Sequence, residues 1–79
     1  MPFMFEVFYK PPVNPMKEHA VTDRVASLGG RLDFREDPSP SGGGVCLTYE
    51  FDDLTLATKA ADVLRHLGEH VEGPSDYGP

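Results

Sequence analysis

Prolines and glycines interrupt this chain more than any other residues. Eight prolines and eight glycines stand in a sequence of only 79 residues. Proline lacks a backbone N–H and glycine favours turns, so both residue types mark the ends of regular elements. Apart from Pro15, which stands where a helix would begin, they all fall outside the segments with a regular apolar pattern. The chain is therefore limited to short helices and strands in a single small domain.

In three segments, 3–9, 31–36 and 45–51, apolar side chains at every second position alternate with a more polar set. This pattern is typical of strands with one buried face. In the second segment the outward side chains are the charged Arg31, Asp33 and Arg35. The side chains expected to face the core are aromatic or aliphatic: Phe3, Phe5, Val7, Tyr9, Leu32, Phe34, Val45, Leu47, Tyr49 and Phe51.

Two segments carry helix signals. Asn14 can cap a helix that begins at Pro15 and runs to about Leu28, where Gly29-Gly30 stops it. Asp52 is predicted to cap a second helix that ends at Gly68. The side chains expected to face the sheet are Val21, Val25, Leu28, Ala57, Ala60, Ala61, Leu64 and Leu67.

The predicted order of elements is β-α-β-β-α, and residues 69–72 could add a short fourth strand. A right-handed crossover followed by a hairpin and a returning helix predicts a ferredoxin-like split β-α-β sandwich of the α+β class. We expect an antiparallel or mixed sheet in the order 4-1-3-2, with both helices on one face. Residues 1–72 would form the single domain, and residues 73–79 a loose C-terminal tail.

The opening segment Phe3-Met-Phe-Glu-Val-Phe-Tyr-Lys-Pro-Pro-Val-Asn-Pro15 resembles the start of the muconolactone isomerase-type dimeric α+β barrels. The resemblance covers residues 3–15 and supports an α+β architecture. It brings no catalytic residue.

The charge balance and the apolar runs exclude several kinds of partner. Thirteen acidic against seven basic residues give a net charge of −6, and a nucleic-acid-binding domain normally shows a basic patch. The apolar runs are far shorter than the roughly 20 residues of a membrane span, and the start lacks signal-peptide features. The single cysteine, Cys46, excludes an internal disulfide and favours a reducing compartment. We therefore expect a cytoplasmic protein that binds neither nucleic acid nor membrane.

The sequence offers no convincing set of catalytic or metal-binding residues. His66 and His70 have a spacing that suits a helical metal site, but Gly68 should end the helix between them. Cys46 lies within a strand, without the histidine or helix N-terminus that would activate a thiol. We expect no catalytic residue, no metal and no cofactor, and favour a protein without enzymatic activity.

The outer face of the predicted sheet combines apolar and charged side chains, which is typical of a contact surface. The first strand could in addition be an open edge that pairs with another chain. We therefore predict a small non-catalytic module that binds a protein partner, or a second copy of itself, through the outer sheet face or the edge of the first strand. The predicted interaction surface consists of Met4, Phe8, Cys46, Thr48 and Arg35.

The alternative is a small-molecule-binding or regulatory domain. In the predicted architecture, the 10–15 loop and the C-terminal tail meet at one end of the sheet, and two prolines stiffen the loop. A small anion or polar ligand could bind between them. The predicted ligand site consists of Lys10, Asn14, Ser75, Asp76 and Tyr77.

Overall fold

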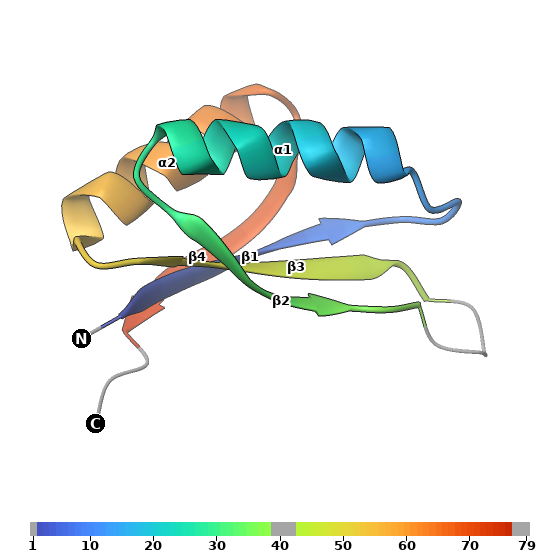
Figure 1. Cartoon of the computed structure of the whole chain (residues 1–79), viewed down its shortest axis with the longest axis horizontal. Coiled ribbons are helices and arrows are strands. Elements are labelled where there is room, and N and C mark those ends of the chain that lie inside the picture. Colours follow the sequence, from blue (N-terminus) through green and yellow to red (C-terminus); the bar gives the residue numbers. More distant parts are fainter. Residues whose placement is uncertain (1, 39–42, 77–79) are drawn as a thin grey trace.

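The computed structural model of the chain describes residues 2–38 and 43–76. Within these residues, four antiparallel strands form one open sheet, and two helices lie together on one side of it (Figure 1). The strand order is β2-β3-β1-β4, as predicted. The elements in chain order are β1 (Phe3–Tyr9), α1 (Pro15–Ser27), β2 (Arg31–Glu36), β3 (Val45–Phe51), α2 (Leu54–His66) and β4 (His70–Asp76).

The hydrophobic core lies between the helices and the inner face of the sheet, where the sequence pattern predicted it. The Phe5 ring packs against the rings of Phe51 and Tyr49, with centroids 5.5 and 5.7 Å away. All three side chains are fully buried. Full burial of a phenylalanine is worth about 1.5–3 kcal/mol, so these rings supply much of the stability of this small core. On α2 the buried positions are mostly alanines, which let the helix approach the sheet: Ala57, Ala60, Ala61 and Leu64.

A glycine follows the C-cap residue of each helix, and the first helix begins at the predicted cap. The side-chain oxygen of Asn14 accepts a hydrogen bond from the backbone N–H of Lys17 at 3.2 Å. Gly29 and Gly68 have φ angles of 97° and 89°, in the left-handed region that favours glycine. Leu67, which was expected in the core, is 57% exposed because α2 ends one residue earlier.

The cap of α2 is Asp53, so the prediction of Asp52 as the cap is wrong. Oδ1 of Asp53 accepts hydrogen bonds from the backbone N–H groups of Thr55 and Leu56, at 2.7 and 3.2 Å. Asp52 instead forms an ion pair with Arg31 on β2, at 3.0 Å. Either of two consecutive aspartates could have capped the helix, and the nearby guanidinium engages the first of them.

An irregularity in β2 reverses the predicted faces of this strand. Leu32 and Phe34 pair with adjacent residues of β3, so Asp33 is an extra residue without a partner of its own in the β2–β3 pairing. One inserted residue exchanges the two faces for every position that follows it. Phe34 therefore faces away from the helices and is 60% exposed, whereas Arg35 faces α1. The predictions that Phe34 points inward and Arg35 outward are wrong.

The fourth strand is longer than predicted. β4 runs from His70 to Asp76 and pairs with β1, so residues 73–76, which the sequence assigned to the loose tail, belong to the sheet. Residues 77–79 lie outside the described residues. Because β1 pairs with β3 on one side and with β4 on the other, the prediction of β1 as an edge strand is also wrong. The edges are β2 and β4.

Candidate functional site

The outer sheet face is the side of the sheet opposite the two helices (Figure 1). The pairing register places its side chains in three rows that cross the strands in the order β2, β3, β1, β4. The first row is Glu36, Cys46, Phe8 and His70; the second is Phe34, Thr48, Glu6 and Glu72; the third is Arg31, Glu50 and Met4.

Two phenylalanines on either side of β3 give this face apolar side chains that are accessible to a partner. Phe8 on β1 is 38% exposed, and Phe34 on β2 is 60% exposed. The ring of His70 on β4 meets the ring of Phe8 edge to face, with centroids 5.5 Å apart. Exposed aromatic side chains held on a rigid sheet are typical anchors of protein interfaces.

Cys46 lies on the central strand β3, in the first row of the outer sheet face, but is largely covered by its neighbours, with 8% of its surface exposed. Its Sγ donates toward Oε2 of Glu6 at 3.4 Å. Burial, and then the adjacent Glu6 carboxylate, raise the pKa of the Cys46 thiol to about 11. The thiol therefore stays protonated at neutral pH and packs as a small apolar group rather than acting as a nucleophile.

Carboxylates outnumber cations on the outer sheet face. Glu6 lies directly opposite Glu72 in the β1–β4 pairing, and like charges in that position destabilise a sheet. Among the described residues no lysine or arginine pairs with Glu6, Glu36 or Glu72; His70 Nε2 lies 3.5 Å from Glu72. Arg31 is already engaged by Glu50, at 3.1 Å, and by Asp52. The face therefore presents uncompensated negative charge around its phenylalanines.

Four of the five residues of the predicted interaction surface lie on the outer sheet face. Met4, Phe8, Cys46 and Thr48 share the outer sheet face, but Arg35 lies on the helix side and does not belong to it. Phe34, His70 and Glu72 also lie on this face and were not predicted there. No sequence signal marked the irregularity that turns Phe34 outward. The other two residues flank the inward-facing Val71, so the alternation around it could have revealed them.

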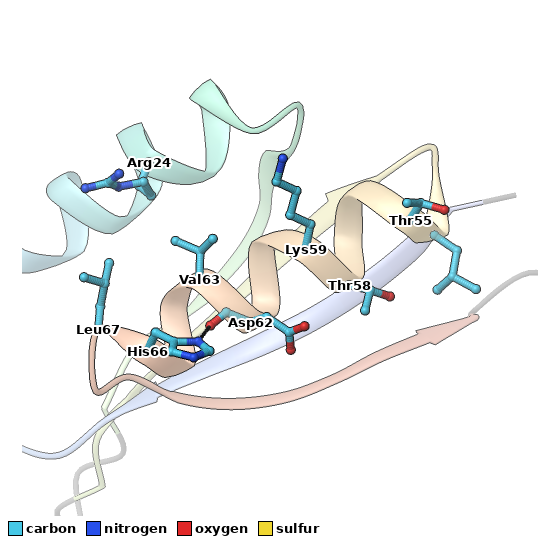
Figure 2. Close-up of a pocket in the computed structure, with 9 residues that line it drawn as sticks. Arg24, Thr55, Thr58, Lys59, Asp62, Val63, His66 and Leu67 are labelled. Carbon is cyan, nitrogen blue, oxygen red and sulfur yellow. Dashed lines mark hydrogen bonds between the residues drawn. The ribbon is translucent and has the colours of Figure 1, made fainter.

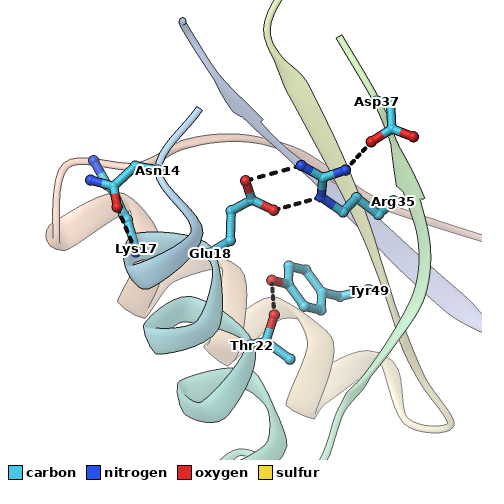
Figure 3. Close-up of polar contacts among 7 residues, drawn as sticks. All are labelled: Asn14, Lys17, Glu18, Thr22, Arg35, Asp37 and Tyr49. Atoms are coloured by element: carbon cyan, nitrogen blue, oxygen red, sulfur yellow. Dashed lines mark hydrogen bonds and ion pairs between the residues drawn. The ribbon is translucent and has the colours of Figure 1, made fainter. Parts of the chain in front are cut away.

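A polar cluster on the helix side explains the position of Arg35 (Figure 3). Its Nε donates to Oε1 of Glu18 on α1 at 2.7 Å, a terminal guanidinium nitrogen lies 3.3 Å from Oε2, and another reaches Asp37. Glu18 is buried, so this ion pair neutralises a carboxylate beneath the helix. Nearby, the hydroxyl groups of Thr22 and Tyr49 are hydrogen-bonded at 2.8 Å, and burial raises the pKa of Tyr49 to about 12.

The structure separates the residues of the predicted ligand site. Lys10 and Asn14 follow the end of β1, whereas Ser75 lies opposite Met4 near the start of β1, with Asp76 beyond it. A strand of seven residues separates the two ends by roughly 20 Å. Tyr77 lies outside the described residues. The predicted meeting of the 10–15 loop and the tail is therefore wrong, because β4 is antiparallel to β1 and carries the tail to the opposite end of the sheet.

A shallow groove runs along the solvent side of α2 (Figure 2). Leu54, Val63 and Leu67 supply its apolar lining. Arg24 and Lys59 contribute two cations, against the single carboxylate of Asp62, which is paired with Arg65. The charge of this groove is thus opposite in sign to that of the outer sheet face. At the end of the same helix, His66 Nδ1 lies 2.8 Å from the carbonyl oxygen of Asp62. His66 and His70 belong to different elements, so they do not share one helix face.

Comparison of the chain with protein-family models, with curated proteins and with solved structures finds no match. In the described part of the chain, no helix is long and apolar enough to cross a membrane.

Proposed function

We propose that this chain is a small non-catalytic protein-association module. Its outer sheet face binds a protein partner that presents basic side chains around an apolar centre. The observation that carries this proposal is the placement of Glu6 directly opposite Glu72. The exposed Phe34 lies in the same row as these two carboxylates, and the exposed Phe8 lies in the neighbouring row. The like-charge pair weakens the sheet, and a basic partner would turn that cost into an attraction.

The charge of the surface favours a basic partner over a second copy of the chain. Two copies stacked face to face would bring two sets of Glu6, Glu36 and Glu72 into one interface. Like charges that are forced together in an interface cost several kcal/mol. Nucleic acid is disfavoured for the same reason, because its phosphates need lysine or arginine on the protein surface. On a protein surface with lysines or arginines around an apolar group, the cations can pair with the carboxylates and the apolar group can pack against the phenylalanines.

The face is a better docking surface than either edge of the sheet. The extra residue Asp33 interrupts the pairing pattern of β2. At the other edge, β4 contains Pro74, which has no backbone N–H to offer to an added strand. Irregular pairing and proline are the devices by which proteins protect sheet edges from added strands. The proposal therefore assigns recognition to side chains of the outer sheet face.

We further propose that the fold is ferredoxin-like and that the protein works in the cytoplasm. The strand order with β1 and β3 at the centre, and two helices on one face, support the ferredoxin-like split β-α-β arrangement. The single, protonated cysteine suits the reducing cytoplasm.

A peptide titration followed by NMR tests the partner chemistry. The probe is an extended peptide that alternates lysine and phenylalanine, and the control probe replaces each lysine by glutamate. We expect the basic peptide to shift the amide signals of Phe8, Cys46, Thr48 and Phe34, and the acidic peptide to leave them unchanged. Shifts confined to the helices, or equal effects of both peptides, would overturn the proposal.

Charge reversal on each side of the molecule provides a matched pair of variants. Glu36→Lys changes the outer sheet face, whereas Asp23→Lys makes the same change on the exposed surface of α1. We expect Glu36→Lys to lower the affinity for the basic peptide by about tenfold, which corresponds to the loss of one charge-assisted contact. Asp23→Lys should leave the affinity nearly unchanged.

Sedimentation equilibrium distinguishes a basic partner from a second copy. We expect a monomer of 8.7 kDa at high micromolar concentration. A dimer that dissociates on Phe34→Glu would instead show that the outer sheet face binds another copy of the chain, and would contradict the charge argument.

A further inference from the structure

An open cavity of about 520 Å³ lies between the 10–15 loop, the first turns of α1 and the start of β3. Val13 from the loop and Val45 from β3 supply part of its apolar lining. Its polar lining includes Tyr9, Lys10 and Lys17. The cavity thus combines an apolar wall with ammonium groups, which is the composition of many small-ligand sites.

The cavity carries a net positive charge in a protein whose overall charge is −6. Lys17 Nζ is paired with Oε1 of Glu69 at 3.3 Å, and the other charged lining residue, Glu18, is neutralised by Arg35. No carboxylate among the described residues pairs with Lys10. The ammonium group of Lys10 is therefore free to meet an anion at this cavity.

Behind the lining residues Tyr9 and Lys17, two buried oxygen atoms have no geometric hydrogen-bond partner in the described part of the chain. They are the hydroxyl oxygen of Tyr9 and Oε2 of Glu69, whose side chain is only 6% exposed. Lys17 joins these residues, because its Nζ also lies 5.3 Å from the centre of the Tyr9 ring. Burial and the nearby Glu69 carboxylate raise the pKa of Tyr9, so its hydroxyl remains a proton donor. Buried polar atoms are nearly always paired in folded proteins, and the Tyr9 hydroxyl and the Glu69 carboxylate lie close enough to interact with each other, so they form the polar inner boundary of this region.

We propose that this cavity binds a small organic anion with an apolar body. The anionic group pairs with the ammonium of Lys10, close to the N-terminus of α1, whose dipole also favours negative charge. The apolar body lies against Val13 and Val45. The side chains proposed to contact the ligand, Lys10, Val13 and Val45, are not members of the three rows of the outer sheet face. Lys10 does line a neighbouring hollow together with Phe8 and His70, so the two sites adjoin at this end of the sheet.

Three benzene derivatives of similar size and shape differ in charge, so they isolate the contribution of the anionic group to binding. Benzoate carries the anion, benzamide is its neutral analogue, and benzylamine carries a cation. In an NMR titration of the whole chain, we expect benzoate to shift the amide signals of Tyr9, Lys10 and Lys17. Loss of one charge-assisted contact corresponds to about tenfold in affinity, so benzamide should bind about tenfold more weakly, and benzylamine should not bind.

Lys10→Met keeps the length of the exposed side chain and removes its charge. We expect it to lower the affinity for benzoate by about tenfold and to leave the affinity for benzamide unchanged. Lys59→Met, on α2, is the matched control and should bind benzoate like the parent chain. Equal binding of benzoate and benzamide, shifts outside this cavity, or full retention of benzoate binding in Lys10→Met would overturn the proposal. None of these results would bear on the outer sheet face.

Discussion

Arg35 on β2 and Glu18 on α1 form an ion pair beneath the helix, with Arg35 Nε 2.7 Å from Glu18 Oε1. The pair forms because the extra residue Asp33 exchanges the two faces of β2 from Phe34 onward, so that Arg35 points toward α1. The same reversal brings Phe34 to the outer sheet face. One inserted residue therefore joins the edge strand to α1 and supplies an exposed aromatic side chain for the proposed association surface.

The reversed face of β2 can be tested by truncating two phenylalanines. Phe5→Ala removes a fully buried ring and should cost about 3–5 kcal/mol. Phe34→Ala removes a ring that is 60% exposed and should lower the free energy of unfolding by less than about 1 kcal/mol. Urea unfolding of both variants measures the difference. Similar costs would place Phe34 in the core and contradict the observed register.

A methyl group at Gly30 should destabilise the chain through a steric clash. A Cβ atom there would lie 2.3 Å from Cζ of Phe51, whose ring is fully buried and has no room to move. Gly30→Ala should therefore lower the free energy of unfolding by about 1–3 kcal/mol.

Gly68→Ala is the matched control for this steric effect. No atom lies within 4 Å of the added methyl group, so only the positive φ of 89° is unfavourable, at a cost of about 1 kcal/mol. A smaller loss of stability for Gly30→Ala than for Gly68→Ala in urea unfolding would contradict the packing of Phe51.

The raised pKa of Cys46 predicts slow alkylation at neutral pH. Because the pKa is about 11, the rate of reaction with iodoacetamide should rise about tenfold per pH unit from pH 7 to 10, without a plateau. Glu6→Gln removes the neighbouring carboxylate, lowers the pKa and should speed the reaction at any given pH. The unfolded chain in urea provides the control, with an ordinary thiol pKa of about 8.5. A plateau below pH 9 in the folded chain would refute this environment for Cys46.

The buried Tyr49 hydroxyl predicts a loss of stability in alkaline solution. Its pKa rises from 10.0 to about 12 on folding, so the folded state holds the proton more tightly than the unfolded state. This contribution is complete below pH 10 and is lost as the pH rises through 12, at about 1.4 kcal/mol per pH unit.

Tyr49→Phe removes the titrating group but also the hydrogen bond to Thr22, which should cost about 1 kcal/mol at neutral pH. The variant should thus be less stable than the parent chain at pH 7 and lose less stability between pH 10 and 12. Urea unfolding at pH 7, 10 and 11 measures both effects. An unchanged alkaline slope in the variant would show that Tyr49 does not cause it.

Much of the fold could be predicted from the sequence because its elements have regular apolar patterns. The bounds of β1, β2 and β3, the strand order and most of the buried positions of the helices follow from alternation, caps and glycines. The exposed Leu67 and the buried Glu18 are the exceptions. The reversal at Asp33 could not be predicted, because Leu32 and Phe34 read as one apolar face of a regular strand. It depends on pairing with β3 and on the contact of Arg35 with α1, which are long-range interactions.

The candidate sites were predictable only in part for a similar reason. Met4, Phe8, Cys46 and Thr48 share the expected face because they lie on regular strands. The C-terminal half of β4 carries glycine and proline and is held by backbone pairing to β1, so no side-chain pattern marked it. If β4 ended at Glu72, the tail could lie beside the 10–15 loop and part of β1 would be an open edge; the pairing of residues 75 and 76 with β1 excludes both.

The most direct test of the association surface is a single variant with two measurements. Glu72→Lys replaces the like-charge pair with Glu6 by an opposite-charge pair. It should raise the free energy of unfolding by about 0.2–1 kcal/mol and weaken binding of the alternating lysine–phenylalanine peptide by about tenfold. We expect stability to rise and affinity to fall in this variant. Unchanged affinity, with or without the gain in stability, would show that the carboxylates of the outer sheet face do not select its partner.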